Sequence, residues 1–205
     1  AALLLKQDHP SWTPDNIRSA MMMTANTGVA LSGTDVAANW FEMGAGRLQV
    51  DAATQTGLIM QETAANYSAA NPQEGGEPRS LNVPAVVDEN CVTSCSWTRT
   101  VTATRSGSWQ VTATAVTSGL STTVSPSSFS LASGQSQTLT FTMDTLGTTN
   151  YAWAYGSVNL TSSTSPDLHI PVAVYASNGS IPQFVDLTAH RNEDSRLLKD
   201  VTTAE

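Results

Sequence analysis

Three histidines are the side chains of this sequence with the widest chemical use. His9 lies at the predicted end of a helix, His169 alternates with apolar neighbours along a predicted strand, and His190 lies in a charged segment. Nucleophilic hydrolysis needs a hydroxyl, a base and a carboxylate that orients the base. Ser136, His169 and Asp144 supply these types, but Ser and Thr are so common here that the combination has no specificity. We therefore expect no catalytic residue in this chain.

Cys91 and Cys95 are the only cysteines of the sequence. In an oxidising compartment they can close a small disulfide loop, and otherwise they remain two free thiols. A structural zinc site needs four ligands, and no second Cys or His pair stands at ligand spacing. We predict a disulfide, with free thiols as the alternative, and we expect neither a metal nor another cofactor.

The aromatic residues Tyr151, Trp153 and Tyr155 admit two interpretations. An exposed row of aromatic rings can stack on sugar rings, whereas buried rings would form part of a hydrophobic core. Packing of these rings in the core or at its edge is favoured, because a small domain usually needs its Trp side chains to fill the hydrophobic interior. These three residues are the candidate aromatic binding surface.

The charge balance excludes some classes of partner. Nine basic and seventeen acidic residues give a formal charge of −8, which repels nucleic acid phosphates and anionic lipids. No apolar run approaches the roughly 20 residues that cross a bilayer. The low content of charged residues, with abundant Thr and Ser, is typical of extracellular β-rich proteins. We therefore expect a secreted or extracellular protein without nucleic acid or membrane partners.

The first sixty residues have a mainly helical pattern. Residues 1–7 begin with an apolar run and have no capping side chain, so we expect the chain to begin inside a helix. A helix over residues 14–25 is well signalled, with Thr13 as its N-cap and Pro14 at its first position. Two further elements are predicted, a short strand over residues 48–50 and a helix over residues 52–59. Two short helices cannot bury these apolar faces alone, so residues 1–60 need a partner.

From residue 81 onward the hydrophobic pattern has a period of two. Leu139, Phe141 and Met143 alternate with threonines, which places the apolar set on one face of a sheet. Pro171 predicts an edge strand or a position that needs no ladder donor. Strands are predicted over residues 81–87, 97–104, 109–117, 121–124 continuing to 129–131, 137–143, 156–162 and 168–176. About seven strands without intervening helices are typical of an antiparallel β-sandwich of immunoglobulin or fibronectin type.

The predicted organisation has four parts. Residues 1–60 form an incomplete helical part, and residues 61–80, rich in Asn, Gln, Glu, Gly and Pro, form a linker. Residues 81–176 form the sandwich. Residues 177–205 carry a dense cluster of charges and are either a charged tail or the start of a further domain.

Several motifs resemble a known family. Residues 1–7 (AALLLKQ) and 9–25 (HPSWTPDNIRSAMMMTA) are similar to the segment that follows the nucleophilic serine in subtilisin-like serine proteases, or subtilases. Residues 43–53 (MGAGRLQVDAA) resemble the strand and helix that close the protease domain. The segments LNVP at 81–84, TRTVT at 98–102, VSPSSF at 124–129, GQSQTL at 134–139 and IPVAV at 170–174 are similar, in this order, to the fibronectin-III-like domain of many subtilases.

The resemblance implies a mostly β chain, in which a fibronectin-III-like sandwich follows a helical remnant of an α/β subtilase catalytic domain. It also implies a secreted serine endopeptidase as parent, whose Ser, His, Asp and oxyanion-hole Asn lie upstream of residue 1. Without them no acyl-enzyme can form, so we expect this chain alone to be inactive. The implied partners are the upstream catalytic domain and the protein substrate of the parent.

The function implied by the resemblance is that of an accessory region, which stabilises the protease domain or shapes substrate access. Two alternatives remain open: a free-standing module that binds a glycan or a protein, and an extracellular spacer. The fold alone does not choose between them, because sandwiches host many functions.

Overall fold

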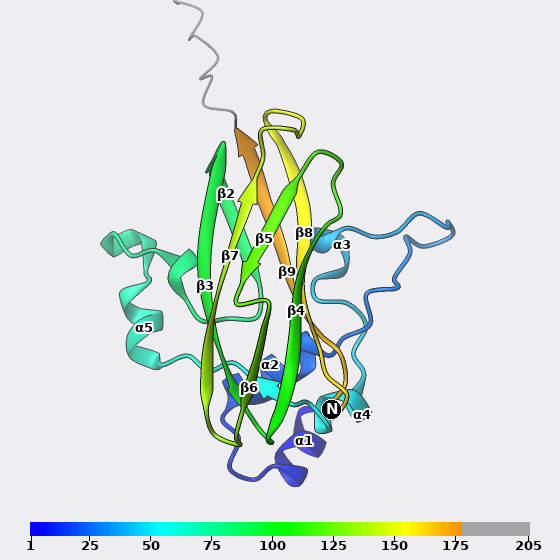
Figure 1. Cartoon of the computed structure of the whole chain (residues 1–205), viewed down its shortest axis with the longest axis vertical. Coiled ribbons are helices and arrows are strands. Elements are labelled where there is room, and N and C mark those ends of the chain that lie inside the picture. Colours follow the sequence, from blue (N-terminus) through cyan, green and yellow to red (C-terminus); the bar gives the residue numbers. More distant parts are fainter. Residues whose placement is uncertain (178–205) are drawn as a thin grey trace, which may run out of the picture.

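The structure, a computed structural model, describes residues 1–177, and within them two β-sheets pack face to face (Figure 1). The first sheet has the order β1 (Leu58–Ile59), β3 (Ser94–Ala103), β7 (Ser136–Asp144) and β5 (Ser121–Ser125). The second has the order β2 (Val86–Val92), β9 (Leu168–Ser177), β8 (Ala152–Thr161), β4 (Gly107–Ala115) and β6 (Ser128–Leu131). The fold is therefore a β-sandwich, as the period-two pattern predicts.

Short helices precede and flank the sandwich. They are α1 (Ala2–Asp8), α2 (Pro14–Met23), α3 (Trp40–Met43), α4 (Val50–Thr54) and α5 (Ala64–Ala69), with 3-10 turns η1 (Pro72–Glu74) and η2 (Pro78–Ser80). The predicted linker, residues 61–80, thus contains α5, η1 and η2. Within residues 1–177, no helix combines the length and the apolarity that a membrane span requires.

Helix α2 begins where its capping residues predict. The side chain of Thr13 accepts a hydrogen bond from the backbone N–H of Asn16, and the Asn16 side chain accepts one from the backbone N–H of Thr13. This reciprocal cap satisfies two N–H groups that a helix start leaves free. Ile17, Ala20 and Met23 are buried on one face of the helix. The helix therefore presents a fixed apolar face to the rest of the chain.

Two predicted elements of the N-terminal segment (residues 1–60) are wrong. The strand expected over residues 48–50 is absent, because Val50 opens helix α4. The helix expected over residues 52–59 ends at Thr54, and Leu58–Ile59 forms strand β1 beside β3. Gly57 marks the change: a side chain there would meet Ser165 Oγ at 2.5 Å, so only glycine allows this close approach.

One hydrophobic core joins the N-terminal segment to the sandwich. It contains Trp109 and Leu160 from the sandwich together with Met23, Leu58 and Met60 from the N-terminal segment. A second, smaller core lies within the N-terminal segment and contains Leu5, Trp12, Ile17, Ala20, Ala53 and Ile59. The larger core therefore spans the predicted domain boundary.

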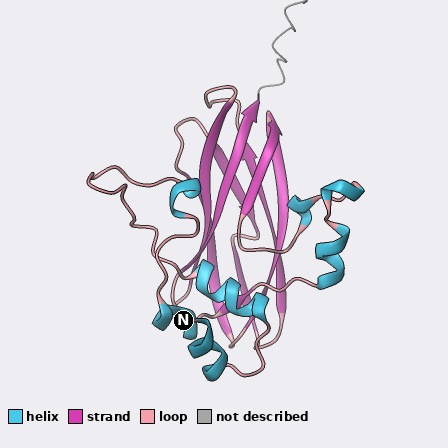
Figure 2. Ribbon diagram, turned by 180° about the vertical axis from the view of Figure 1, so that it is seen from behind, coloured by secondary structure: helices cyan, strands magenta, loops and turns pink. Residues whose placement is uncertain are grey.

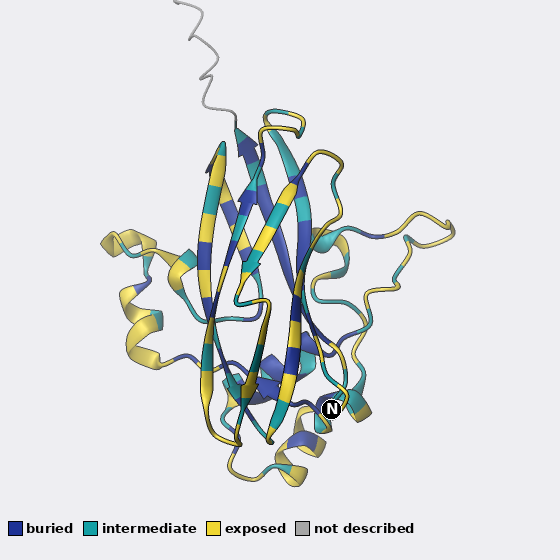
Figure 3. Cartoon of the chain, in the orientation of Figure 1, coloured by how far each residue is buried: buried dark blue, intermediate teal, exposed yellow. Residues whose placement is uncertain are grey.

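The two sheets differ in what covers their outer faces. Helices α2 and α3 lie against β9 on the outer face of the second sheet (Figure 2), and β9 is buried along nearly its whole length. The outer face of the first sheet carries the more exposed residues of β3, β7 and β5, which alternate with more buried residues along each strand (Figure 3). Its outward side chains are Ser or Thr except for Asp144. The N-terminal segment thus covers only one side of the sandwich.

Strand β9 corrects two expectations. It lies between β2 and β8, so the edge position considered for Pro171 is wrong. The ladder with β2 begins at Val172, one residue beyond Pro171, which is compatible with the missing donor of proline. The β2–β9 pair is parallel, in contrast to the antiparallel pairing predicted for the sandwich. The predicted charged tail or further domain, residues 177–205, lies outside the described residues except for Ser177, and His190 lies outside them as well.

Candidate functional site

The structure does not assemble Ser136, His169 and Asp144 into a catalytic triad. Ser136 and Asp144 lie at opposite ends of β7, and His169 lies on β9 in the other sheet. The Ser136 hydroxyl forms a hydrogen bond with Thr102 Oγ1 at 2.9 Å. His169 Nε2 lies 2.9 Å from the carbonyl oxygen of Ala45. His9 Nε2 lies 2.9 Å from the carbonyl oxygen of Thr54. Both described histidines thus contact backbone carbonyls rather than a nucleophile.

Within residues 1–177, no group of three or more His, Cys, Asp or Glu side chains lies close enough together to hold a metal ion. The two cysteines are joined in the structure, with a Cα–Cα distance of 5.4 Å. This distance is within the usual range for a disulfide. Cys91 lies on β2 and Cys95 on β3, so the bond links the two sheets at the turn between these strands.

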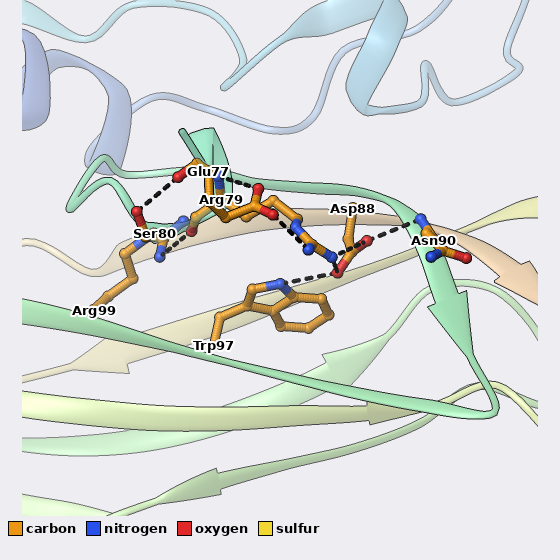
Figure 4. Close-up of polar contacts among 7 residues, drawn as sticks. All are labelled: Glu77, Arg79, Ser80, Asp88, Asn90, Trp97 and Arg99. Atoms are coloured by element: carbon orange, nitrogen blue, oxygen red, sulfur yellow. Dashed lines mark hydrogen bonds and ion pairs between the residues drawn. The ribbon is translucent and has the colours of Figure 1, made fainter. Parts of the chain in front are cut away.

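A polar network of the sandwich surrounds the buried carboxylate of Asp88 (Figure 4). We call it the Asp88 cluster, and it consists of Glu77, Arg79, Asp88 and Trp97. Arg79 Nη1 donates to both carboxylate oxygens of Asp88 at 2.9 Å, and Arg79 Nη2 donates to Glu77 Oε2 at 2.6 Å. The indole N–H of Trp97 donates to Asp88 Oδ2 at 3.2 Å. The cluster connects η2 to both sheets, because Asp88 lies on β2 and Trp97 on β3.

The electrostatics of the Asp88 cluster suit structure rather than acid–base catalysis. Hydrogen bonds to Glu77 and then to Asp88 raise the pKa of Arg79 above its already high ordinary value. The hydrogen bond from Arg79 lowers the pKa of the Glu77 carboxyl. A general acid or base needs a pKa near the working pH. Both shifts move away from neutrality, so Arg79 and Glu77 remain charged.

Arg99 forms a second polar anchor beside the Asp88 cluster. Its guanidinium is almost fully buried and donates to four backbone carbonyls, those of Val83, Arg79, Thr98 and Ala85, at 2.8–3.2 Å. Burial lowers the pKa of Arg99 to about 10, while the carboxylate of Glu62 acts in the opposite direction. Arg99 therefore stays charged at neutral pH and holds the segment before β2 against β3. A groove of about 410 Å³ runs beside these side chains.

The structure brings two of the three predicted aromatic residues together. Trp153 and Tyr155 on β8 both contact Phe41 of α3 edge to face, with ring centroids 4.7 and 5.9 Å apart. Trp153 also contacts Tyr175 of β9 at 5.5 Å. Tyr151 lies just before β8 and is 40% exposed. Sequence reasoning missed Phe41 and Tyr175, because no local pattern connects them to β8.

Trp40 provides a further link between the N-terminal segment and the sandwich. Its indole N–H donates to the backbone carbonyl of Gly156 at 2.8 Å. Its ring lies nearly parallel to that of His169, with centroids 6.0 Å apart. Burial lowers the pKa of His169, although hydrogen bonds from its imidazole to the backbone of Ala45 and of Met23 act in the opposite direction. Helix α3 is thus held to β8 and β9 through both of its first two residues.

Comparison with known proteins gives this architecture a family. A subtilisin-like protease of Arabidopsis thaliana, SBT1.7, is 31% identical over 175 residues, which are 70% of this chain and 23% of the relative. The family described as "Fibronectin type-III domain" matches residues 80–174. This chain is a subtilase C-terminal region with a fibronectin type-III-like domain.

Two further matches describe the relatives of this subtilase region. The CO(2)-response secreted protease of Arabidopsis thaliana is 38% identical over 71 residues, which are 32% of this chain and 9% of the relative. Among solved structures, the secreted serine protease VesC from Vibrio cholerae has a TM-score of 0.40 and 15% identity, over 62% of this chain and 24% of that one. The chain thus spans less than a quarter of the length of the curated relatives named here. It is an accessory region of a subtilase.

Proposed function

We propose that this chain is the non-catalytic accessory region of a secreted subtilisin-like serine endopeptidase, and that it stabilises the protease domain. One observation carries the proposal: Met23, Leu58 and Met60 lie in the same core as the sandwich residues Trp109 and Leu160. Burial of apolar side chains is the dominant favourable contribution to folding. Removal of the sandwich would therefore expose apolar side chains of the N-terminal segment.

Polar contacts support the same role. Strand β1 pairs with β3, so the N-terminal segment contributes a strand to the first sheet. The Ser19 hydroxyl of α2 accepts a hydrogen bond from the backbone N–H of Met60 at 2.7 Å. The hydroxyl of Thr104, beyond β3, donates to the carbonyl of Thr56 at 2.6 Å. These contacts fix α2 and β1 relative to the sandwich rather than leaving them on a free linker.

Helix α1 offers the surface for the proposed catalytic domain. Leu5 is fully buried, whereas Leu3 is 85% exposed and Leu4 is 56% exposed. Two adjacent exposed leucines are compatible with a surface that a partner covers. In the proposed arrangement the upstream subtilase catalytic domain covers these side chains. The parent acts on a protein substrate, and neither nucleic acid nor a membrane takes part.

The secreted location is part of this proposal. Its support is that one relative is named a secreted protease, together with the low content of charged residues in this chain. The proposal also holds that the chain alone does not hydrolyse casein. Hydrolysis by the purified chain that a serine-directed inhibitor abolishes would contradict this.

The experiment that tests the stabilising role uses the full-length protein that contains this chain. Deletion of residues 81–177 should lower the melting temperature of the protease domain and its yield in soluble form, while the relative kcat/KM values for a panel of peptide substrates stay the same. A changed order of substrate preference with an unchanged melting temperature would favour a role in substrate access. An unaltered enzyme would contradict both roles and leave the spacer and the binding module.

The alternative of a free-standing binding module would use Tyr151, Trp153 and Tyr155 as a platform. Phe41 packs against two of these rings, which supports intramolecular packing over a free sugar platform. A pull-down with insoluble polysaccharide tests the alternative directly. Retention of the chain, lost in Trp153→Ala but kept in the exposed control Gln61→Ala, would favour the binding module.

A further inference from the structure

A polar cleft lies where the N-terminal segment meets the sheet that contains β8 and β9. Its volume is about 580 Å³, which is within the usual range for small-molecule sites. Asn26, Trp40 and Gln49 line it from the N-terminal segment, and Asn159, Thr161 and Asp167 line it from the sandwich. Clefts between two packed units are a preferred location for ligand sites. The aromatic residues of β8 considered above do not line this cleft.

The walls of the cleft are held in place by contacts that leave other polar groups available. The amide of Asn159 donates to the hydroxyls of Thr114 and Ser157 at 3.0 and 3.1 Å, which fixes its orientation. Trp40 is fixed by its bond to the Gly156 carbonyl. By contrast, Gln49, Thr161 and Asp167 make no side-chain hydrogen bond to another described residue.

The charge of the cleft restricts its ligand. Asp167 contributes a carboxylate, and no Lys or Arg is among the lining residues. The remaining titratable residue of the lining is His169, and burial lowers its pKa, so it is neutral at neutral pH. A carboxylate without a neighbouring cation repels an anionic ligand. The cleft therefore disfavours an anionic ligand, and its otherwise uncharged polar lining suits a neutral ligand with several hydroxyls.

We propose that this cleft binds a neutral saccharide. A carboxylate accepts hydrogen bonds from two hydroxyls, and an amide can donate to one hydroxyl and accept from the next. Asp167 and Gln49 provide a carboxylate and an amide in the lining, and Thr161 adds a hydroxyl. The same lining includes Trp40, whose apolar surface suits the C–H face of a sugar ring. An extended peptide is the competing ligand class, because β9 pairs with β2 only from Val172 onward and Leu168 and His169, which line the cleft, precede that pairing.

The ligand would contact both the N-terminal segment and the sandwich. Gln49 and Trp40 belong to the former, and Asp167 and Thr161 belong to the latter. A ligand that binds only the folded, joined state raises the apparent stability of the chain. The saccharide should therefore raise the melting temperature as well as occupy the cleft. This inference is independent of whether the chain stabilises a protease domain.

The test is a titration of the ¹⁵N-labelled full chain with cellobiose, maltose and N,N′-diacetylchitobiose. The signals to follow are the side-chain amides of Gln49 and Asn159 and the indole N–H of Trp40. At least one sugar should give saturable shifts of these signals with a Kd of ~1 mM. Gln49→Ala and Asp167→Ala should weaken binding by about tenfold, while Gln73→Ala and Asp35→Ala, exposed residues outside the cleft, should leave it unchanged.

Three controls keep the proposal falsifiable. Sorbitol at the same concentration separates binding from a general polyol effect, glucuronate tests the role of the Asp167 charge, and a neutral hexapeptide tests the competing ligand class. Glucuronate should bind more weakly than the neutral sugars. The proposal is overturned if no sugar shifts the three signals, if sorbitol shifts them equally, if only the hexapeptide does so, or if the cleft variants bind as the parent chain does.

Discussion

The carboxylate of Asp88 accepts a hydrogen bond from each of two side chains on different elements, and its contact with Arg79 at 2.9 Å is the shorter. The Asp88 side chain is 2% exposed, whereas that of Arg79 is 39% exposed. Solvent therefore screens the guanidinium, and the strength of the pair depends on the burial of the carboxylate. The pair anchors η2 to β2.

Replacement of Asp88 should destabilise the sandwich. Asp88→Ala leaves the indole N–H of Trp97 buried without this acceptor and removes one of the two carboxylate partners of Arg79. We expect the free energy of unfolding to fall by about 2–4 kcal/mol, measured by urea denaturation. Glu89→Ala, at the exposed neighbouring position of β2, should change it by less than about 0.5 kcal/mol. Equal effects of the two substitutions would contradict the anchoring role.

Replacement of Leu58 should show that the N-terminal segment and the sandwich unfold together. Leu58 is fully buried in the shared core, so Leu58→Ala should cost about 2–5 kcal/mol. Far-ultraviolet circular dichroism and tryptophan fluorescence should still report one coincident transition. Leu48→Ala, at a position that is 43% exposed, is the matched control. Two separate transitions would show that the two parts fold independently.

The stability of the chain should depend on pH through Glu62. Burial alone would raise the pKa of Glu62, but hydrogen bonds from Asn82, Asn66 and Thr63 lower it below its ordinary value of 4.5. Above pH 4.5 the carboxyl is ionised in both states and its contribution is complete. As the pH falls through 4.5 toward the lower folded pKa, the unfolded chain takes up the proton first, so the contribution is lost.

Glu62→Gln should therefore reduce the free energy of unfolding by about 1–2 kcal/mol at neutral pH, and this difference should shrink in acid. Urea denaturation at a series of pH values measures it. Glu74→Gln, on the exposed η1 turn, should follow the parent chain at every pH. A difference between parent and Glu62→Gln that does not change with pH would rule out the ionised carboxylate as its source.

The disulfide should contribute to stability through the unfolded state. The loop between Cys91 and Cys95 is short, so its closure is worth about 2 kcal/mol. Reduction with dithiothreitol should lower the urea midpoint, and the double variant Cys91→Ala with Cys95→Ala should lack this response. A thiol assay of the unreduced, denatured chain provides an independent check. Two reactive thiols in that assay would support the alternative of free cysteines.

Local periodicity predicts most of the sandwich. The alternation of Leu139, Phe141 and Met143 with threonines reappears as the buried and exposed faces of β7. The cap at Thr13 correctly places the start of α2. These strands can be predicted because successive side chains of a strand point to opposite faces of the sheet, so apolar and polar residues alternate along the sequence. The prediction fails at Leu58–Ile59, where pairing with β3 overrides the apparent helical pattern.

The candidate site is less predictable, because its contacts join distant parts of the sequence. Phe41 meets Trp153, and Trp40 meets Gly156, across more than half of the chain. No local pattern connects these residues, so the sequence indicates the aromatic residues of β8 but not the helix that packs against them. The cleft beside Asp167 was missed for the same reason, since its two walls come from separate segments.

The parallel pairing of β2 with β9 affects how the chain reaches its native state. Val86 lies opposite Val172, so the pair closes a loop of more than eighty residues. Pairings of high contact order form slowly, because the entropy of loop closure must be overcome before the contact stabilises the fold. Until residues 172–177 leave the ribosome, β2 lacks its hydrogen-bonding neighbour, and we expect this strand to be where a chaperone binds the nascent chain.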